Sequence, residues 1–120
     1  VLVMLGGALG AVSRYTVTLV SARLFGTAFP WGTLVVNLIG CLIIGLLFGL
    51  AERTEWVSPG MRLFIATGFL GALTTFSTFA YETVAAAGTG SAGVAAANLI
   101  VSNAAGLALV FAGMWLARLG

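Results

Sequence analysis

Residues 71–79, GALTTFSTF, bring hydroxyl side chains and aromatic rings together inside a hydrophobic segment. The side chains concerned are Thr74, Thr75, Ser77 and Thr78, with Phe76 and Phe79 among them. A hydroxyl donates a hydrogen bond and the edge of an aromatic ring is electropositive, so this set suits a small anion. The alternative is an ordinary helix, with its phenylalanines in lipid or core and its hydroxyls bonded to its own carbonyls.

Amide side chains stand at depth in two other hydrophobic segments. Asn37 follows Thr33 by one helical turn, and Asn98 and Ser102 are four positions apart, so they share a helical face. An unpaired amide in hydrocarbon costs on the order of a few kcal/mol, so each amide needs a partner. These residues either join helices to one another or face a pore, and their spacing leaves both possibilities open.

Two charged residues belong to the same region. Arg14 is the only charge near the middle of the first hydrophobic segment, where a charge is expensive and often functional. Glu82 lies beyond Phe79, toward the side of the membrane where the first segment ends. We expect either an Arg14–Glu82 ion pair or an Arg14 side chain that reaches a vestibule and attracts anions.

Several classes of function lack the residues that they need. The chain has no histidine and one cysteine, Cys41, so it cannot assemble a zinc site from sets of these residues. Its five arginines form no basic patch of the kind that nucleic acids require. No base, nucleophile or central carboxylate stands among the deep polar residues, so the sequence does not support an enzyme.

The composition places these groups in a lipid bilayer. The 120 residues are 61% hydrophobic and 7% charged, whereas soluble domains carry roughly a quarter charged residues. A spanning helix needs about 20 mostly apolar residues. Residues 2–24, 31–51, 61–86 and 94–118 meet this requirement. We predict a multi-pass, all-α protein of the plasma (inner) membrane, a single domain over residues 1–120 with both termini on one side.

The third segment is predicted to break near its middle. Gly68, Gly71 and the paired threonines lie between two halves that are each too short to span the membrane. Glycine weakens a helix, and threonine offers the backbone a competing partner. Carbonyls freed at membrane depth are tolerated only where protein or a polar cavity surrounds them.

The glycine spacing and the arginine distribution bear on assembly. The pairs Gly6 with Gly10 and Gly45 with Gly49 are small-xxx-small motifs, which pack helices within one chain or between two copies. One side of the membrane would carry three arginines, at positions 53, 62 and 118, and the other Arg23 with Arg14 deeper. This bias is weak, which leaves an antiparallel dimer possible.

The segments GGALGAVSRY, WGTLVVNLIGC and TGFLGALTTFSTF resemble the Fluc fluoride channels, also called the CrcB family, in the same order and spacing. The resemblance implies an antiparallel, dual-topology homodimer with two pores that export fluoride from the cytoplasm by passive conduction. Phe76 and Phe79 would line each pore with their ring edges, and Asn37, Ser77 and Thr78 would stand beside them. A polar track follows on the fourth segment, where Asn98, Ser102 and Gly106 occupy positions that often begin with a tyrosine.

The same resemblance implies a structural sodium ion at the dimer centre, held by the carbonyl oxygens of Gly71 and Thr74 from both copies. A small dual-topology multidrug or cation transporter is the first alternative, but its first helix would need an embedded glutamate where this chain has Arg14. A membrane assembly subunit that transports nothing is the second.

Overall fold

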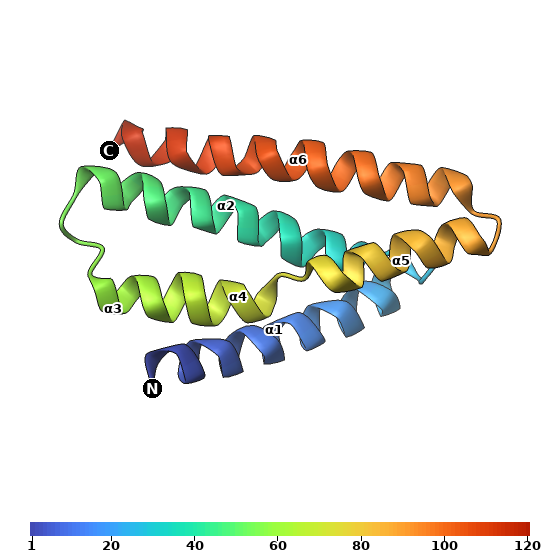
Figure 1. The fold of residues 1–120 in the computed structure, drawn as a ribbon, viewed down its shortest axis with the longest axis horizontal. Helices are drawn as coiled ribbons and strands as arrows, with labels where there is room; N and C mark the ends of the chain where they lie inside the picture. The colour runs from blue at the N-terminus through green and yellow to red at the C-terminus, as the bar shows by residue number, and fades with distance from the viewer.

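The computed structural model describes all 120 residues, and every regular element in it is a helix (Figure 1). Helices α1 (Leu2–Phe25), α2 (Trp31–Arg53) and α6 (Ala92–Leu119) are continuous. The third span consists of α3 (Pro59–Arg62), the π-helix η1 (Leu63–Leu70), α4 (Gly71–Leu73) and α5 (Phe76–Gly88). Four spans are long and apolar enough to cross a membrane, and both termini lie at the same end. The predicted four-span fold is confirmed.

The third span is broken at Thr74 and Thr75, as the sequence predicted. Both residues are extended, with ψ angles of 156° and 115°, and Figure 1 shows the non-helical link between α4 and α5. Thr74 Oγ1 donates to the Leu70 carbonyl at 2.8 Å, and Thr75 Oγ1 accepts from the Thr78 N–H at 3.2 Å. The first bond secures the end of α4 and the second caps the start of α5.

The π-helix before the break was not predicted. In η1 the backbone is wider than in an α-helix, and at its end the N–H of Gly71 reaches the carbonyl of Ala66, five residues earlier. The sequence LFIATGFL contains no proline that would mark the irregularity. A single-turn π-bulge is common at functional sites, and this eight-residue stretch is separated from the break only by the three residues of α4.

The glycine pairs bring helices together inside one chain. A Cβ added to Gly6 would lie 2.2 Å from the carbonyl oxygen of Phe64 in η1, so α1 packs directly on the η1 backbone. A Cβ added to Gly45 would lie 2.3 Å from the carbonyl oxygen of Val110, which joins α2 to α6. Gly10 and Gly49 are crowded too, since an added Cβ would lie 2.2 Å from the Phe69 carbonyl oxygen and 2.7 Å from the Ala117 Cβ, respectively. These pairs therefore serve packing within the chain, and they give no support to a homodimer.

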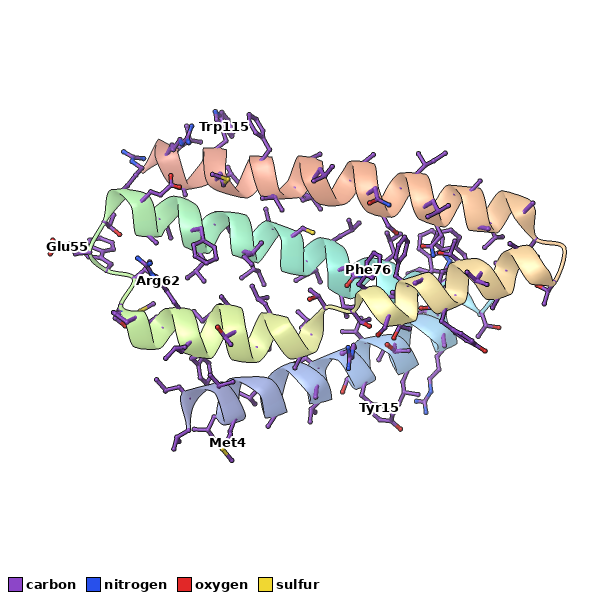
Figure 2. The ribbon with its side chains drawn as sticks, viewed as in Figure 1. Met4, Tyr15, Glu55, Arg62, Phe76 and Trp115 are labelled. Carbon is purple, nitrogen blue, oxygen red and sulfur yellow. The ribbon has the colours of Figure 1, made fainter.

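The small core lies between α2 and the first half of the third span. Val36, Leu70 and Leu73 are buried together at its centre. Large apolar side chains elsewhere face outward, and Figure 2 shows Met4, Tyr15 and Trp115 projecting away from the bundle. Exposed apolar surface of this extent fits a lipid environment.

Candidate functional site

Asn37 of α2 binds the backbone of the break. Its Oδ1 accepts from the N–H of Thr75 at 2.8 Å, and its Nδ2 donates to the carbonyl of Thr75 at 3.1 Å. These two bonds fix the orientation of the amide, because a backbone N–H can only donate and a carbonyl can only accept. Asn37 thus joins α2 to the broken span. One amide N–H of Asn37 takes no part in this pairing and is left for another acceptor.

Thr75 is the centre of a hydroxyl cluster at the start of α5. Its buried side chain is 3.0 Å from Thr78 Oγ1 and 3.3 Å from Ser77 Oγ, in addition to capping the Thr78 N–H. The side chains of Ser77 and Thr78 are exposed at the first turn of α5. Free N–H groups and the positive end of the helix dipole favour an anion at such a terminus. Thr75 was predicted only as one of four hydroxyl residues. The signal that could have singled it out is a threonine followed three residues later by a second hydroxyl residue, Thr78.

Phe76 and Phe79 contact each other but differ in their surroundings. Their ring centroids are 5.7 Å apart and the rings are tilted by 51°. Phe79 is 7% exposed, whereas Phe76 is 78% exposed and lies at the start of α5, beside the break (Figure 2). The pair therefore extends from the protein interior to a surface that no other part of the chain covers.

Arg14 and Glu82 do not form the ion pair that the sequence suggested. Arg14 Nη1 instead donates to the carbonyl of Thr74 at 3.3 Å, and Glu82 accepts a hydrogen bond from the hydroxyl of Thr33. Each side chain reaches a nearer polar partner, so the pair is replaced by two separate contacts. Both residues still line one pocket of about 360 Å³, with the hydroxyls of Thr18, Thr75 and Thr78.

The carbonyl groups expected to hold sodium are at the break. In a continuous helix the Gly71 carbonyl would accept from the N–H of Thr75, but that N–H donates to Asn37 instead. The Thr74 carbonyl accepts only the long bond from Arg14. Gly71, Thr74 and Phe76 also border a second pocket of about 400 Å³, which lies between α2 and the broken span.

A hydrogen-bond relay joins α5 to α6. Asn98 Nδ2 donates to Thr83 Oγ1 at 2.8 Å, Thr83 Oγ1 donates to the Phe79 carbonyl at 2.8 Å, and Ser102 Oγ donates to Asn98 Oδ1 at 3.1 Å. We call Thr83, Asn98 and Ser102 the α5–α6 relay. Asn98 is 1% exposed, so in one chain it joins helices and lines no open cavity. Thr83 was missed, because a lone threonine in a helix usually bonds only to its own backbone.

The predicted site residues thus fall into two connected groups. Asn37, Ser77 and Thr78 meet around Thr75 at the break, with the Gly71 and Thr74 carbonyls beside them. Asn98 and Ser102 are linked to the Phe79 turn through Thr83. Their roles toward an ion remain predictions.

Comparison with known proteins gives a consistent result. The family described as "CrcB-like protein, Camphor Resistance (CrcB)" matches residues 1–114. The "Fluoride-specific ion channel FluC 1" of Streptomyces avermitilis is 46% identical over 98% of this chain and 94% of its own length. The "Fluoride-specific ion channel FluC" of Agrobacterium fabrum is 47% identical over the same shares, and that of Acidobacterium capsulatum is 48% identical over 93% and 90%.

Proposed function

The chain belongs to the CrcB-like family, and from this membership we propose that it is a fluoride-specific ion channel of the plasma membrane. The observation that carries the proposal is its identity of 46–48%, over nearly the whole chain, to bacterial proteins named as fluoride-specific channels. Four membrane-spanning helices are the architecture that a multi-pass channel needs.

The chemistry at the break supports a pathway for an anion. Fluoride is small and strongly hydrated, so a pore must replace its water with hydrogen-bond donors. The exposed hydroxyls of Ser77 and Thr78, the free amide N–H of Asn37 and the first turn of α5 supply such donors. The ring edges of Phe76 and Phe79 add weaker positive potential in a setting that excludes water.

The entrance to this pathway is the pocket that contains Arg14. Its guanidinium is half-buried and reaches the carbonyl of Thr74, so it places a positive charge next to the break. Glu82, on the same pocket, accepts a hydrogen bond from Thr33 and makes no ion pair with Arg14. The guanidinium, rather than the pocket as a whole, is therefore the group that attracts an anion beside the break.

The functional unit is a homodimer of antiparallel copies with two fluoride pathways. In a single chain the ring of Phe76 is exposed, and the Gly71 carbonyl lacks its helical donor. At membrane depth such a carbonyl must be covered by protein or by a polar cavity. A second copy laid across the break would supply that cover and complete the pathway around Phe76.

The dimer centre would hold a structural sodium ion on the carbonyl oxygens of Gly71 and Thr74. Carbonyl oxygens are suitable ligands for a hard cation, and the Gly71 carbonyl is available. The Thr74 carbonyl has a second lone pair beside its bond to Arg14. Bound there, the ion would keep the facing carbonyls of the two copies from repelling one another.

Passive conduction is tested by fluoride efflux from liposomes loaded with potassium fluoride and reconstituted with the purified protein. A fluoride electrode follows release before and after valinomycin is added. We expect almost no release until valinomycin lets potassium carry the compensating charge, and then rapid release. Equal release without valinomycin would indicate electroneutral, coupled transport, and no release above protein-free liposomes would reject fluoride conduction.

A further inference from the structure

Helix α2 contacts the break at a second position, about one turn beyond Asn37. Gly40 is three residues after Asn37, so the two residues lie on the same face of α2, and Gly40 is buried. A Cβ added to Gly40 would lie 2.2 Å from Cγ2 of Thr74 and 3.7 Å from its Cβ, and no other residue from outside α2 comes within 4 Å of it. The methyl group of Thr74 therefore fills the space that a side chain at position 40 would need.

This methyl group cannot turn aside without loss. Thr74 Oγ1 donates to the Leu70 carbonyl at 2.8 Å, and this bond sets the rotamer that aims the methyl group at Gly40. The same carbonyl accepts from the N–H of Thr74 at 3.0 Å. Rotation of the side chain would break the hydroxyl bond at the end of α4, whereas a shift of Thr74 away from α2 would pull on the Asn37 pair at the next residue.

The position of Thr74 affects the groups that we propose for the ions. Its carbonyl accepts from Arg14 at 3.3 Å, and Phe76 begins α5 two residues later. Gly40 itself lines the pocket of about 400 Å³ that Thr74 and Phe76 also border. A displaced Thr74 would therefore alter both the carbonyl and the wall of this pocket.

We propose that Gly40 is a positioning residue of the ion pathway: the space left by its missing side chain receives the methyl group of Thr74 and so fixes how the broken span sits against α2. The inference rests on the proposed function and deepens it. Asn37 holds the backbone of Thr75, and Gly40 seats the side chain of the residue before it, so one face of α2 determines the geometry of both residues in the link. Gly40 acts through Thr74 and not on the ion.

The test pairs a substitution that fills the space with one that empties it. Gly40→Ala adds the Cβ that meets the Thr74 methyl group. Thr74→Ser removes that methyl group but keeps the hydroxyl for Leu70, and the remaining Cβ, 3.7 Å away, is at an ordinary contact distance. Alanine is a better helix former than glycine, so helix propensity cannot explain a loss in Gly40→Ala.

Fluoride efflux from liposomes is measured at equal amounts of folded, full-length protein for wild type, both single variants and the double variant. We expect Gly40→Ala to lower the rate about tenfold in wild type, but less than about twofold when it is added to Thr74→Ser. The midpoint of thermal unfolding in detergent should show the same rescue. Wild-type flux in folded Gly40→Ala, or equal losses in the two backgrounds, would overturn the proposal.

Gly49→Ala is the matched control, because it crowds the same helix against Ala117 and Met114 of α6 and not against the break. It should lower the unfolding midpoint, and Thr74→Ser should not restore that stability. The folded Gly49→Ala protein should conduct within about twofold of wild type. An equal fall in flux for Gly49→Ala would show that any crowding of α2 slows the channel, which contradicts a specific role for Gly40.

The remaining outcomes are also decisive. If Gly40→Ala does not fold, a folded and conducting double variant supports the proposal, and a double variant that fails to fold while Thr74→Ser folds rejects it. If wild type carries no fluoride, the proposed function fails, whereas the unfolding midpoints still show whether Gly40 and the Thr74 methyl group are coupled. If wild type conducts and Thr74→Ser gives no rescue, only the inference about Gly40 fails.

Discussion

At the scale of single residues, Asn37 has the most specific geometry. It pairs with the N–H and the carbonyl of Thr75, so its side chain supplies the two hydrogen bonds that a continuous helix would otherwise make with this residue. From sequence, joining helices and facing a pore were alternatives for this residue. The structure shows the first directly, and the amide proton that remains leaves room for the second.

Asn37→Ala tests how far the break depends on this pairing. The substitution leaves the N–H and carbonyl of the buried Thr75 without partners, which costs about 1–3 kcal/mol for each group. We expect lower thermal stability in detergent and a fluoride efflux rate reduced by about tenfold or more. Asn103→Ala, which removes an exposed amide, is the control. Wild-type stability and flux in Asn37→Ala would refute the role.

The two phenylalanines should respond differently to the same change. Phe76 is 78% exposed in one chain, so Phe76→Ile should alter stability by less than about 0.5 kcal/mol. If its ring edge lines the pathway, efflux should still fall about tenfold. Phe79→Ile should lower both, because Phe79 is buried and its loss leaves a cavity. Normal flux through a folded Phe76→Ile variant would indicate that the exposed ring only contacts lipid or neighbouring side chains and does not line the pathway.

At the scale of elements, the sequence predicted the helical spans and the break, because these features depend on residues that are close together in the chain. The four spans follow from apolar length, and the break from paired threonines beside glycines. The start of α3 has an equally local cause, because Ser58 Oγ accepts from the Met61 N–H at 3.1 Å and Pro59 lies in the first turn. These signals lie within a few residues of the feature that they specify.

Features that depend on how helices rotate against each other could not be predicted. The partner of Arg14 lies 60 positions away, and which carbonyl it meets depends on the path of α4. The π-helix changes the register of the third span with no marker residue. Thr83 became visible only once α5 and α6 were seen side by side, with Asn98 against it.

The packing of α1 on η1 gives a prediction with a built-in control. Gly6→Ala places a Cβ 2.2 Å from the Phe64 carbonyl oxygen, and neighbouring backbone cannot move aside easily. We expect a loss of about 1–3 kcal/mol in thermal or denaturant unfolding. Gly7→Ala meets only the Gly68 carbonyl oxygen, at 3.9 Å, and should be tolerated. Equal stability of the two variants would contradict the close contact between these helices.

At the scale of the whole molecule, a single chain exposes the ring of Phe76 and leaves the Gly71 carbonyl without its helical donor. A pocket lies beside the break. Because the glycine pairs pack within the chain, a second copy must use other surface, and the region around Gly71 and Phe76 is the one that we propose. Light scattering of the protein in detergent, corrected for bound detergent, should give about twice the chain mass of 12.2 kDa. A purely monomeric, active protein would contradict the proposed assembly.

The central claim is that the broken third span builds a pathway which replaces the water of fluoride with hydroxyl, amide and ring-edge donors. Paired halide efflux from one proteoliposome preparation tests it most directly, with fluoride and chloride followed by separate electrodes in the presence of valinomycin. We predict rapid fluoride release and chloride release no faster than from protein-free liposomes. Chloride release as fast as fluoride, or no fluoride release at all, would contradict the account.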